Sequence, residues 1–212
     1  MIYLDSNATT QVHPDVLEAM LPYLQDQCYN PSSGYRAGKA VKRALEQARG
    51  QLAALIGAAP EEIIFMGCGT EANNAALCSL ATAVGAGKRI ITSQIEHSSI
   101  LRTCEALEKR GHAVELVGVG ADGRLDLAAW EAACGREDAG FATLMWANNE
   151  TGVLQPVAEA AAIAHAAGLP FHSDAIQAVG KCPVDVGAIP SVDFLSISGH
   201  KFHAPKGVGA LY

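Results

Sequence analysis

The fold is decided by the stretch Ser196-Ile-Ser-Gly-His-Lys201-Phe-His-Ala-Pro-Lys-Gly-Val-Gly-Ala-Leu-Tyr212. An apolar run over residues 192–197 leads into small and polar residues, and a glycine-rich turn then leads to a second apolar run. This pattern predicts that Lys201 follows the end of a buried strand. Partial burial there lowers the pKa of a lysine toward the range in which its amine is a nucleophile. The alternative is an ordinary lysine in a surface loop.

Upstream of this stretch, strand-like apolar runs alternate with helix-like segments. Helices are predicted to begin near Thr70, Ser98, Asp126, Pro156 and Ala175, after two earlier helices, one from about Pro14 and one that ends at Gly57. Near-continuous apolar strands are typical of sheets that helices cover on both faces. We therefore predict a three-layer α/β/α fold with a mostly parallel central sheet of about seven strands and right-handed crossovers, the last strand being a candidate for antiparallel pairing. The predicted strands are residues 63–66, 89–92, 114–117, 142–146, 169–172, 192–197 and 208–212.

Composition and charge exclude several classes of protein. Half of the 212 residues are apolar and 17% are charged, which argues against disorder. The net charge of −7 argues against nucleic acid and anionic membrane surfaces as partners. No apolar run approaches the roughly 18 residues of a membrane span. The start of the chain lacks a signal-peptide pattern and the six cysteines form no C-x-x-C pair, so a cytoplasmic protein is expected.

Polar residues follow five of the predicted strands. In open α/β sheets, ligands bind just beyond the carboxyl ends of the strands, so these side chains are expected to converge on one edge. The candidates in chain order are Gly69, Thr70, His97, Asn149, Asp174, His200 and Lys201.

Each candidate has an ordinary structural alternative. Gly69 and Thr70 open a helix and predict a phosphate seat, although a threonine N-cap has the same pattern. Asp174 is an anion in apolar company that needs a cationic partner, or else it caps a helix. Gln177 lies three residues further on and is predicted to share its helical face. His97 could stack on a ring or move protons, but a lone histidine is more often simply hydrogen-bonded. Asn149 alone carries no signal.

Together these features describe a pocket for pyridoxal phosphate. A lysine forms the Schiff base, and a carboxylate pairs with the protonated pyridine nitrogen so that the ring acts as an electron sink.

Other sequence motifs do not have the structural context that their function requires. The G-x-G-x-x-G match at 118–123 is not followed directly by a helix, and residues 85–88 lack the first glycine and the hydroxyl residue of a P-loop. His200-x-x-His203 has no third ligand at a usable spacing, so no metal site is expected.

A series of ordered motifs then identifies a resemblance. The chain resembles the cysteine desulfurases of the nitrogen-fixation type, which are class V, fold-type-I pyridoxal phosphate enzymes, from residue 3 to residue 212. The motifs are Tyr3-Leu-Asp-Ser-Asn-Ala-Thr-Thr, Asn30-Pro-Ser-Ser, Cys68-Gly-Thr-Glu-Ala-Asn-Asn74, Glu96-His97, Trp146-Ala-Asn-Asn-Glu-Thr-Gly152, His172-Ser-Asp-Ala-Ile-Gln-Ala-Val-Gly-Lys181 and Ser198-Gly-His-Lys-Phe-His-Ala-Pro-Lys-Gly-Val-Gly209.

The resemblance implies a role for each candidate residue. Lys201 would hold the cofactor and move protons, and His97 would stack on the ring and assist acid–base steps. Asp174 would pair with the pyridine nitrogen, Gln177 would bond the phenolic oxygen, and Asn149 would lie near the ring and the substrate. The implied phosphate ligands are Gly69, Thr70, Ser198 and His200.

The implied reaction is removal of sulfur from L-cysteine, which leaves alanine and an enzyme persulfide and supplies sulfur for iron–sulfur cluster assembly. The expected partners are a second copy of the chain in a homodimer and a sulfur-accepting scaffold protein. The alternatives are another class V enzyme, such as a selenocysteine lyase or a small-amino-acid aminotransferase, or an inactive truncated fragment.

The expected domain organisation is an N-terminal arm over residues 1–12 and a cofactor-binding large domain over residues 13–212. Because the chain stops on an apolar strand at Tyr212, we expect it to be the first part of a longer protein that lacks its C-terminal small domain. The persulfide-forming cysteine and the arginine that binds the substrate carboxylate are expected in that absent part. The 212 residues are therefore expected to bind pyridoxal phosphate weakly and not to turn over cysteine.

Overall fold

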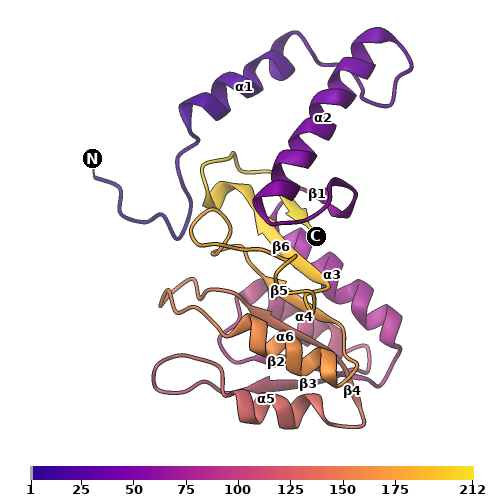
Figure 1. The fold of residues 1–212 in the computed structure, drawn as a ribbon, viewed down its shortest axis with the longest axis vertical. Coiled ribbons are helices and arrows are strands. Elements are labelled where there is room, and N and C mark those ends of the chain that lie inside the picture. The colour runs from indigo at the N-terminus through magenta and orange to yellow at the C-terminus, as the bar shows by residue number, and fades with distance from the viewer. Residues whose placement is uncertain (1) are drawn as a thin grey trace.

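The computed structural model describes residues 2–212, which form a seven-stranded sheet between two layers of helices (Figure 1). This confirms the predicted three-layer fold. The strands are β1 (Ile64–Met66), β2 (Arg89–Ser93), β3 (Ala113–Val117), β4 (Ala139–Met145), β5 (Phe171–Asp174), β6 (Phe194–Ser198) and β7 (Gly209–Leu211).

The order of the strands in the sheet is β1-β7-β6-β5-β4-β2-β3. Strands β6, β5, β4, β2 and β3 pair in parallel, whereas β7 is antiparallel to both of its neighbours. The antiparallel pairing considered for the last strand is therefore confirmed. All seven strands lie within a few residues of their predicted positions. The strand predicted at 169–172 starts two residues later, because Pro170 has no amide hydrogen to donate to a ladder.

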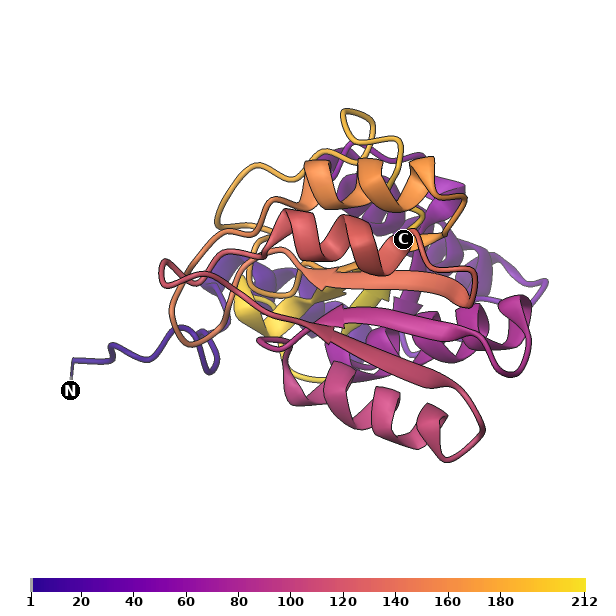
Figure 2. The same cartoon turned by 90° about the horizontal axis from the view of Figure 1, so that it is seen from below.

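The helices lie on both faces of the sheet (Figure 2). Helices α3 (Gly69–Val84) and α4 (Ser98–Glu108) cover one face, and α5 (Leu127–Cys134) and α6 (Val157–Ala166) cover the other. Two short 3-10 turns, η1 (Pro60–Glu62) and η2 (Gly199–Lys201), precede β1 and follow β6. On the α5–α6 face, the rings of Trp130 and Phe171 meet edge to face at 6.4 Å, and the Trp130 indole donates to the Ala160 carbonyl. None of the helices in the described part of the chain is long and apolar enough to cross a membrane.

The prediction of a helix that begins near Ala175 is wrong. Residues 176–181 form turns in which the amides of Ala178 and Val179 both donate to the Ala175 carbonyl. The turns do not extend into a helix because Gly180 has a φ of 78°, outside the helical region, and Pro183 follows. Gln177 and Asp174 therefore do not share a helical face. Both line the same cavity, but helical spacing is not the reason.

Helices α1 (Pro14–Gln25) and α2 (Arg36–Leu55) project from one end of the sheet (Figure 1). Their amphipathic pattern predicts a buried apolar face, but Leu17, Leu21 and Leu24 are 51%, 41% and 68% exposed. An apolar groove lies between the two helices, and no residue from 2 to 212 covers it. Its lining includes Val16, Met20, Tyr23, Leu24, Val41 and Leu45.

Candidate active site

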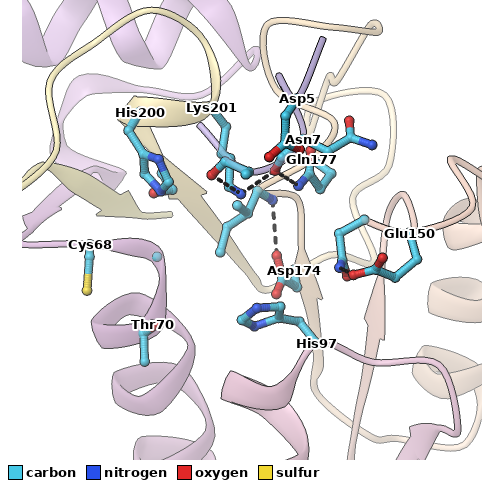
Figure 3. A pocket seen from close by; sticks show the side chains of 15 residues that line it. Asp5, Asn7, Cys68, Thr70, His97, Glu150, Asp174, Gln177, His200 and Lys201 are labelled. Atoms are coloured by element: carbon cyan, nitrogen blue, oxygen red, sulfur yellow. Dashed lines mark hydrogen bonds between the residues drawn. The ribbon is translucent and has the colours of Figure 1, made fainter. Parts of the chain in front are cut away.

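A cavity of about 470 Å³ opens at the carboxyl ends of the parallel strands (Figure 3). All of the predicted site residues line it. Strand ends, helix starts and the N-terminal arm each contribute to the lining, as expected for a ligand site in an open α/β sheet. The lining residues are Asp5, Asn7, Ala8, Cys68, Gly69, Thr70, His97, Asn149, Glu150, Asp174, Ile176, Gln177, Ser198, His200 and Lys201.

The N-terminus of α3 forms one wall of the cavity. The first turn of a helix leaves backbone N–H groups without intrahelical partners, and its dipole favours an anion. Gly69 leaves little room for a side chain, because a Cβ at this position would overlap the end of the Ile176 side chain and would lie 3.1 Å from Ser198 Cβ. The backbone of α3 therefore packs closely against β6 and the turn after β5. Together with the Thr70 hydroxyl, this arrangement suits a phosphate group.

Asp174 ends β5 in the middle of the cavity floor. Asp174 is 4% exposed, and its carboxylate accepts two hydrogen bonds, one per oxygen. The Ile176 N–H donates to Oδ1 at 3.0 Å, and the side chain of Asn73 donates to Oδ2 at 2.7 Å. Burial raises the pKa of Asp174, and these two hydrogen bonds oppose the rise. A cation bonded to this carboxylate would further favour its ionised form.

Lys201 is the last residue of η2, the turn that follows β6, and its side chain enters the cavity. Burial lowers the pKa of Lys201, and the negative charges of Asp174 and Asp5 oppose that change. Its Nζ donates to the backbone carbonyls of Asn7 and Ala8, the latter at 2.9 Å. The arm thus lies across the amine, as Figure 3 shows.

His97 lies next to Asp174 in the cavity, and its imidazole ring faces the carboxylate (Figure 3). It is the N-cap of α4, and its Nδ1 accepts a hydrogen bond from the backbone N–H of Ser99 at 3.1 Å. The cap fixes the ring at the start of the helix. The hydrogen-bonded role weighed for His97 from the sequence is therefore present, and its stacking or proton-transfer role stays a prediction.

The remaining side chains are tied to the arm or to their neighbours. The Nδ1 of His200 lies 3.0 Å from Thr9 Oγ1, and burial together with the nearby lysines lowers the pKa of His200. Gln177 donates from Nε2 to the Asn7 carbonyl at 2.9 Å. Asn149 donates from Nδ2 to Glu150 Oε1 at 2.6 Å.

Sequence reasoning missed the contribution of the arm and of several neighbours of the named residues. Asp5, Asn7 and Ala8 line the cavity although they lie about as far from Lys201 in the sequence as the chain allows. No local periodicity links such distant segments, so only the polar run Asp5-Ser6-Asn7 could have drawn attention to them. Glu150 and Ile176 were missed because they are close in sequence to positions with a clearer chemical signal.

The residues present fit pyridoxal phosphate. A close-packed helix N-terminus suits its phosphate, a buried carboxylate with two donors already in place suits its ring nitrogen, and a half-buried amine suits its aldehyde. Among residues 2–212, no group of three or more His, Cys, Asp or Glu side chains is arranged to hold a metal ion.

Comparison with known proteins agrees with this chemistry. The family model described as Aminotransferase class-V matches residues 2–212. A protein named cysteine desulfurase 2 from Trichormus variabilis is 50% identical over 212 residues, which are all of this chain and 53% of that protein. A cysteine desulfurase from Enterobacter agglomerans is 49% identical over 100% of this chain and 52% of its own length.

Solved structures show the same fold. A structure described as a NifS-like protein superposes with a TM-score of 0.96 at 37% identity, covering 100% of this chain and 58% of the other. A structure described as SspA in complex with cysteine gives a TM-score of 0.96 at 38% identity, covering 100% of this chain and 61% of the other. The chain therefore spans about half the length of the curated relatives it matches.

Proposed function

The chain belongs to the class-V aminotransferase family, and from that premise we propose that it is the cofactor-binding part of a pyridoxal-phosphate-dependent cysteine desulfurase. The observation that carries the proposal is that Lys201, Asp174 and His97, from three different elements, line one cavity. The relatives named cysteine desulfurase and the cysteine-bound structural neighbour support L-cysteine as the substrate.

In this proposal each side chain that lines the cavity has a defined role. When bound, pyridoxal phosphate supplies an electron sink for the substrate. Lys201 holds the cofactor through Nζ and carries protons to and from the substrate carbon, for which a lowered pKa is an advantage. Asp174 accepts a hydrogen bond from the ring nitrogen. The N-terminus of α3, together with Ser198 and His200, holds the phosphate, while Gln177 bonds the phenolic oxygen and Asn149 lies near the substrate.

The sulfur-accepting thiol is proposed to come from outside the 212 residues. Burial raises the pKa values of Cys104 and Cys134 to about 12, so neither forms a thiolate readily. Cys68 lines the cavity, but it is the N-cap of α3 and accepts a hydrogen bond from the Glu71 N–H. A thiol that must carry sulfur away cannot be fixed at a helix end. The relatives are about twice as long as this chain, which leaves room for a mobile cysteine and for an arginine that binds the substrate carboxylate.

The proposal includes a homodimer that donates sulfur to a scaffold protein for iron–sulfur cluster assembly in the cytoplasm. The apolar groove between α1 and α2 supports an interface at this end of the molecule, because exposed leucines at Leu17, Leu21 and Leu24 are unfavourable in water. Sedimentation of the full-length protein tests the oligomeric state.

Borohydride reduction with pyridoxal phosphate tests the site. The chain is incubated with the cofactor, reduced, digested and mapped by mass spectrometry. We expect the cofactor on Lys201, and no label in Lys201→Ala. Lys181→Ala and Lys206→Ala serve as matched controls and should still be labelled. A label found mainly on Lys181 or Lys206 would contradict the assignment.

A second measurement tests the source of the thiol. The chain is incubated with L-cysteine, pyridoxal phosphate and a reductant, and sulfide and alanine are quantified. We expect no multiple turnovers from the 212 residues alone. Multiple turnovers that disappear in Cys68→Ala would move the nucleophile into this part of the protein.

A further inference from the structure

Asn73 is a polar side chain on the buried face of α3. Its neighbours on that face are Ala72, Ala76 and Leu77, and its own exposure is 0%. Its Nδ2 donates to Asp174 Oδ2 at 2.7 Å and to Ser99 Oγ at 2.8 Å. Its Oδ1 has no hydrogen-bond partner among residues 2–212. An unpaired oxygen in an apolar face is unfavourable, so we infer that the amide is present because of the hydrogen bonds that its nitrogen donates.

The directions of these hydrogen bonds follow from donor and acceptor chemistry. An ionised carboxylate can only accept, so the atom of Asn73 that faces Asp174 is the amide nitrogen. The same nitrogen gives its second hydrogen to Ser99 Oγ, so the hydroxyl hydrogen of Ser99 remains available. The ring nitrogen Nδ1 of His97 lies 2.8 Å from that hydroxyl.

The same reasoning fixes the tautomer of His97. The backbone N–H of Ser99 donates to Nδ1 at 3.1 Å, and a backbone amide cannot accept in return. Since Nδ1 is an acceptor for this amide, the Ser99 hydroxyl is the donor in its contact with the same atom. Nδ1 therefore carries no proton, and the neutral ring has its proton on Nε2.

We propose that Asn73 and Ser99 are positioning residues for the cofactor site, linking Asp174 to His97 through the hydrogen bonds Asp174–Asn73–Ser99–His97. The hydrogen bond from Asn73 favours the ionised form of the carboxylate and holds it toward the position proposed for the ring nitrogen of pyridoxal phosphate. Ser99 holds Nδ1 of His97 as a hydrogen-bond acceptor, so that the neutral form of the ring beside Asp174 has its proton on Nε2. This inference rests on the proposed function for the identity of the cofactor, but the tautomer of His97 does not depend on any ligand.

The first test needs no cofactor. Long-range ¹H–¹⁵N correlation spectra of the histidine-labelled chain distinguish the two neutral tautomers, and His97→Gln assigns the signal. We expect the Nε2–H form for His97. A spectrum that shows the proton on Nδ1 would overturn the Ser99 half of the proposal.

The second test compares two ligands in two variants. The ligands are pyridoxal phosphate and its 1-deaza analogue, in which carbon replaces the ring nitrogen. Losing a hydrogen bond to a charged group should weaken binding of pyridoxal phosphate to Asn73→Ala about 10-fold, or about 1.4 kcal/mol. The analogue should bind Asn73→Ala as it binds wild type, because it makes no hydrogen bond to Asp174.

Asn74→Ala is the matched control, since Asn74 is the next residue on α3 and also makes two hydrogen bonds, to Thr70 and Thr103. It should change the affinities for both ligands by the same factor. Asn73→Leu, which keeps the volume but lacks the amide, gives the same comparison if Asn73→Ala does not fold. Equal weakening of both ligands in the Asn73 variants would mean that Asn73 only packs. Failure of the wild-type chain to bind pyridoxal phosphate would refute the proposed function instead, and the His97 spectrum would still decide the tautomer.

Discussion

Substituting Glu96 by glutamine should make the protein more stable above neutral pH. Glu96 directly precedes His97 and is 6% exposed. Its Oε1 accepts from Ser93 Oγ at 2.6 Å and from the Met145 N–H at 2.9 Å, whereas Oε2 has no partner in the part of the chain that the structure describes. Burial raises the pKa of Glu96 from 4.5 to about 8; the two hydrogen bonds lower it, and the charge of Asp174 raises it further.

The size of the effect follows from proton linkage. Between pH 4.5 and about 8 the folded chain holds a proton on Glu96 that the unfolded chain has released. The free energy of unfolding therefore falls as the pH rises, by up to about 1.4 kcal/mol per pH unit. Glutamine has the shape of the protonated acid and does not titrate. Glu96→Gln should match wild type near pH 4.5 and exceed it by about 3 to 5 kcal/mol at pH 8.

Urea unfolding at pH 5, 6, 7, 8 and 9 measures this difference. Groups that do not interact with Glu96, such as the buried His172 whose pKa burial lowers to about 3, titrate alike in both proteins, so the difference between the two curves reports Glu96 and the groups coupled to it. Glu131→Gln is the control, because Glu131 is exposed on α5. Its curve should follow wild type. Parallel curves for Glu96→Gln and wild type would refute the reasoning, as would a variant that is less stable at every pH.

Two further predictions concern residues that shape the fold near the site and away from it. Gly209→Ala should destabilise the protein by about 2 to 3 kcal/mol, because the added Cβ would lie 2.7 Å from both the Cys68 carbonyl carbon and the Ile197 oxygen, and backbone atoms cannot move aside easily. Thermal unfolding measures this, with Gly34→Ala as the control because a Cβ there would meet no atom within 4 Å. A change below about 0.5 kcal/mol for Gly209→Ala would contradict the packing argument. Asp126→Ala should cost about 1 kcal/mol, because the carboxylate caps α5 by accepting from the N–H groups of Ala128 and Ala129 at 3.0 Å. Urea midpoints measure this loss, and Asp126→Asn should restore most of the stability.

The positions of the main site residues could be predicted from the sequence because a parallel sheet gathers its strand ends at one edge. Asp174 and Lys201 are far apart in the chain, yet each follows a buried run, and β5 and β6 are neighbours in register. The order of the strands was not predictable in the same way. The pairing of β7 between β1 and β6 depends on close packing of Gly209 against Cys68, which no periodicity reveals.

Two other features depend on tertiary contacts alone. Gln177 reaches the cavity through a series of turns and a hydrogen bond to the arm, not through the helical spacing that its position after Asp174 suggested. The arm itself is held by Thr10, which donates to the His200 carbonyl through both its backbone N–H and its hydroxyl. Such contacts join the two ends of the described chain, and a local pattern contains no information about them.

Buried side chains with an unpaired polar atom occur mainly next to the site. Buried polar atoms without a hydrogen-bond partner occur, among residues 2–212, at Asn73, Thr92 and Glu96, and two of these three residues lie in or beside the groups that face the cavity. Buried unpaired atoms lower stability, so a sequence shaped by stability alone would replace them with apolar side chains. Apolar cores on both faces of the sheet offset this cost. The gain in stability expected for Glu96→Gln and the loss of ligand discrimination expected for Asn73→Ala are both consequences of buried polar groups at this edge of the sheet, and under the proposed function such groups hold a charged ligand at the expense of the free energy of folding.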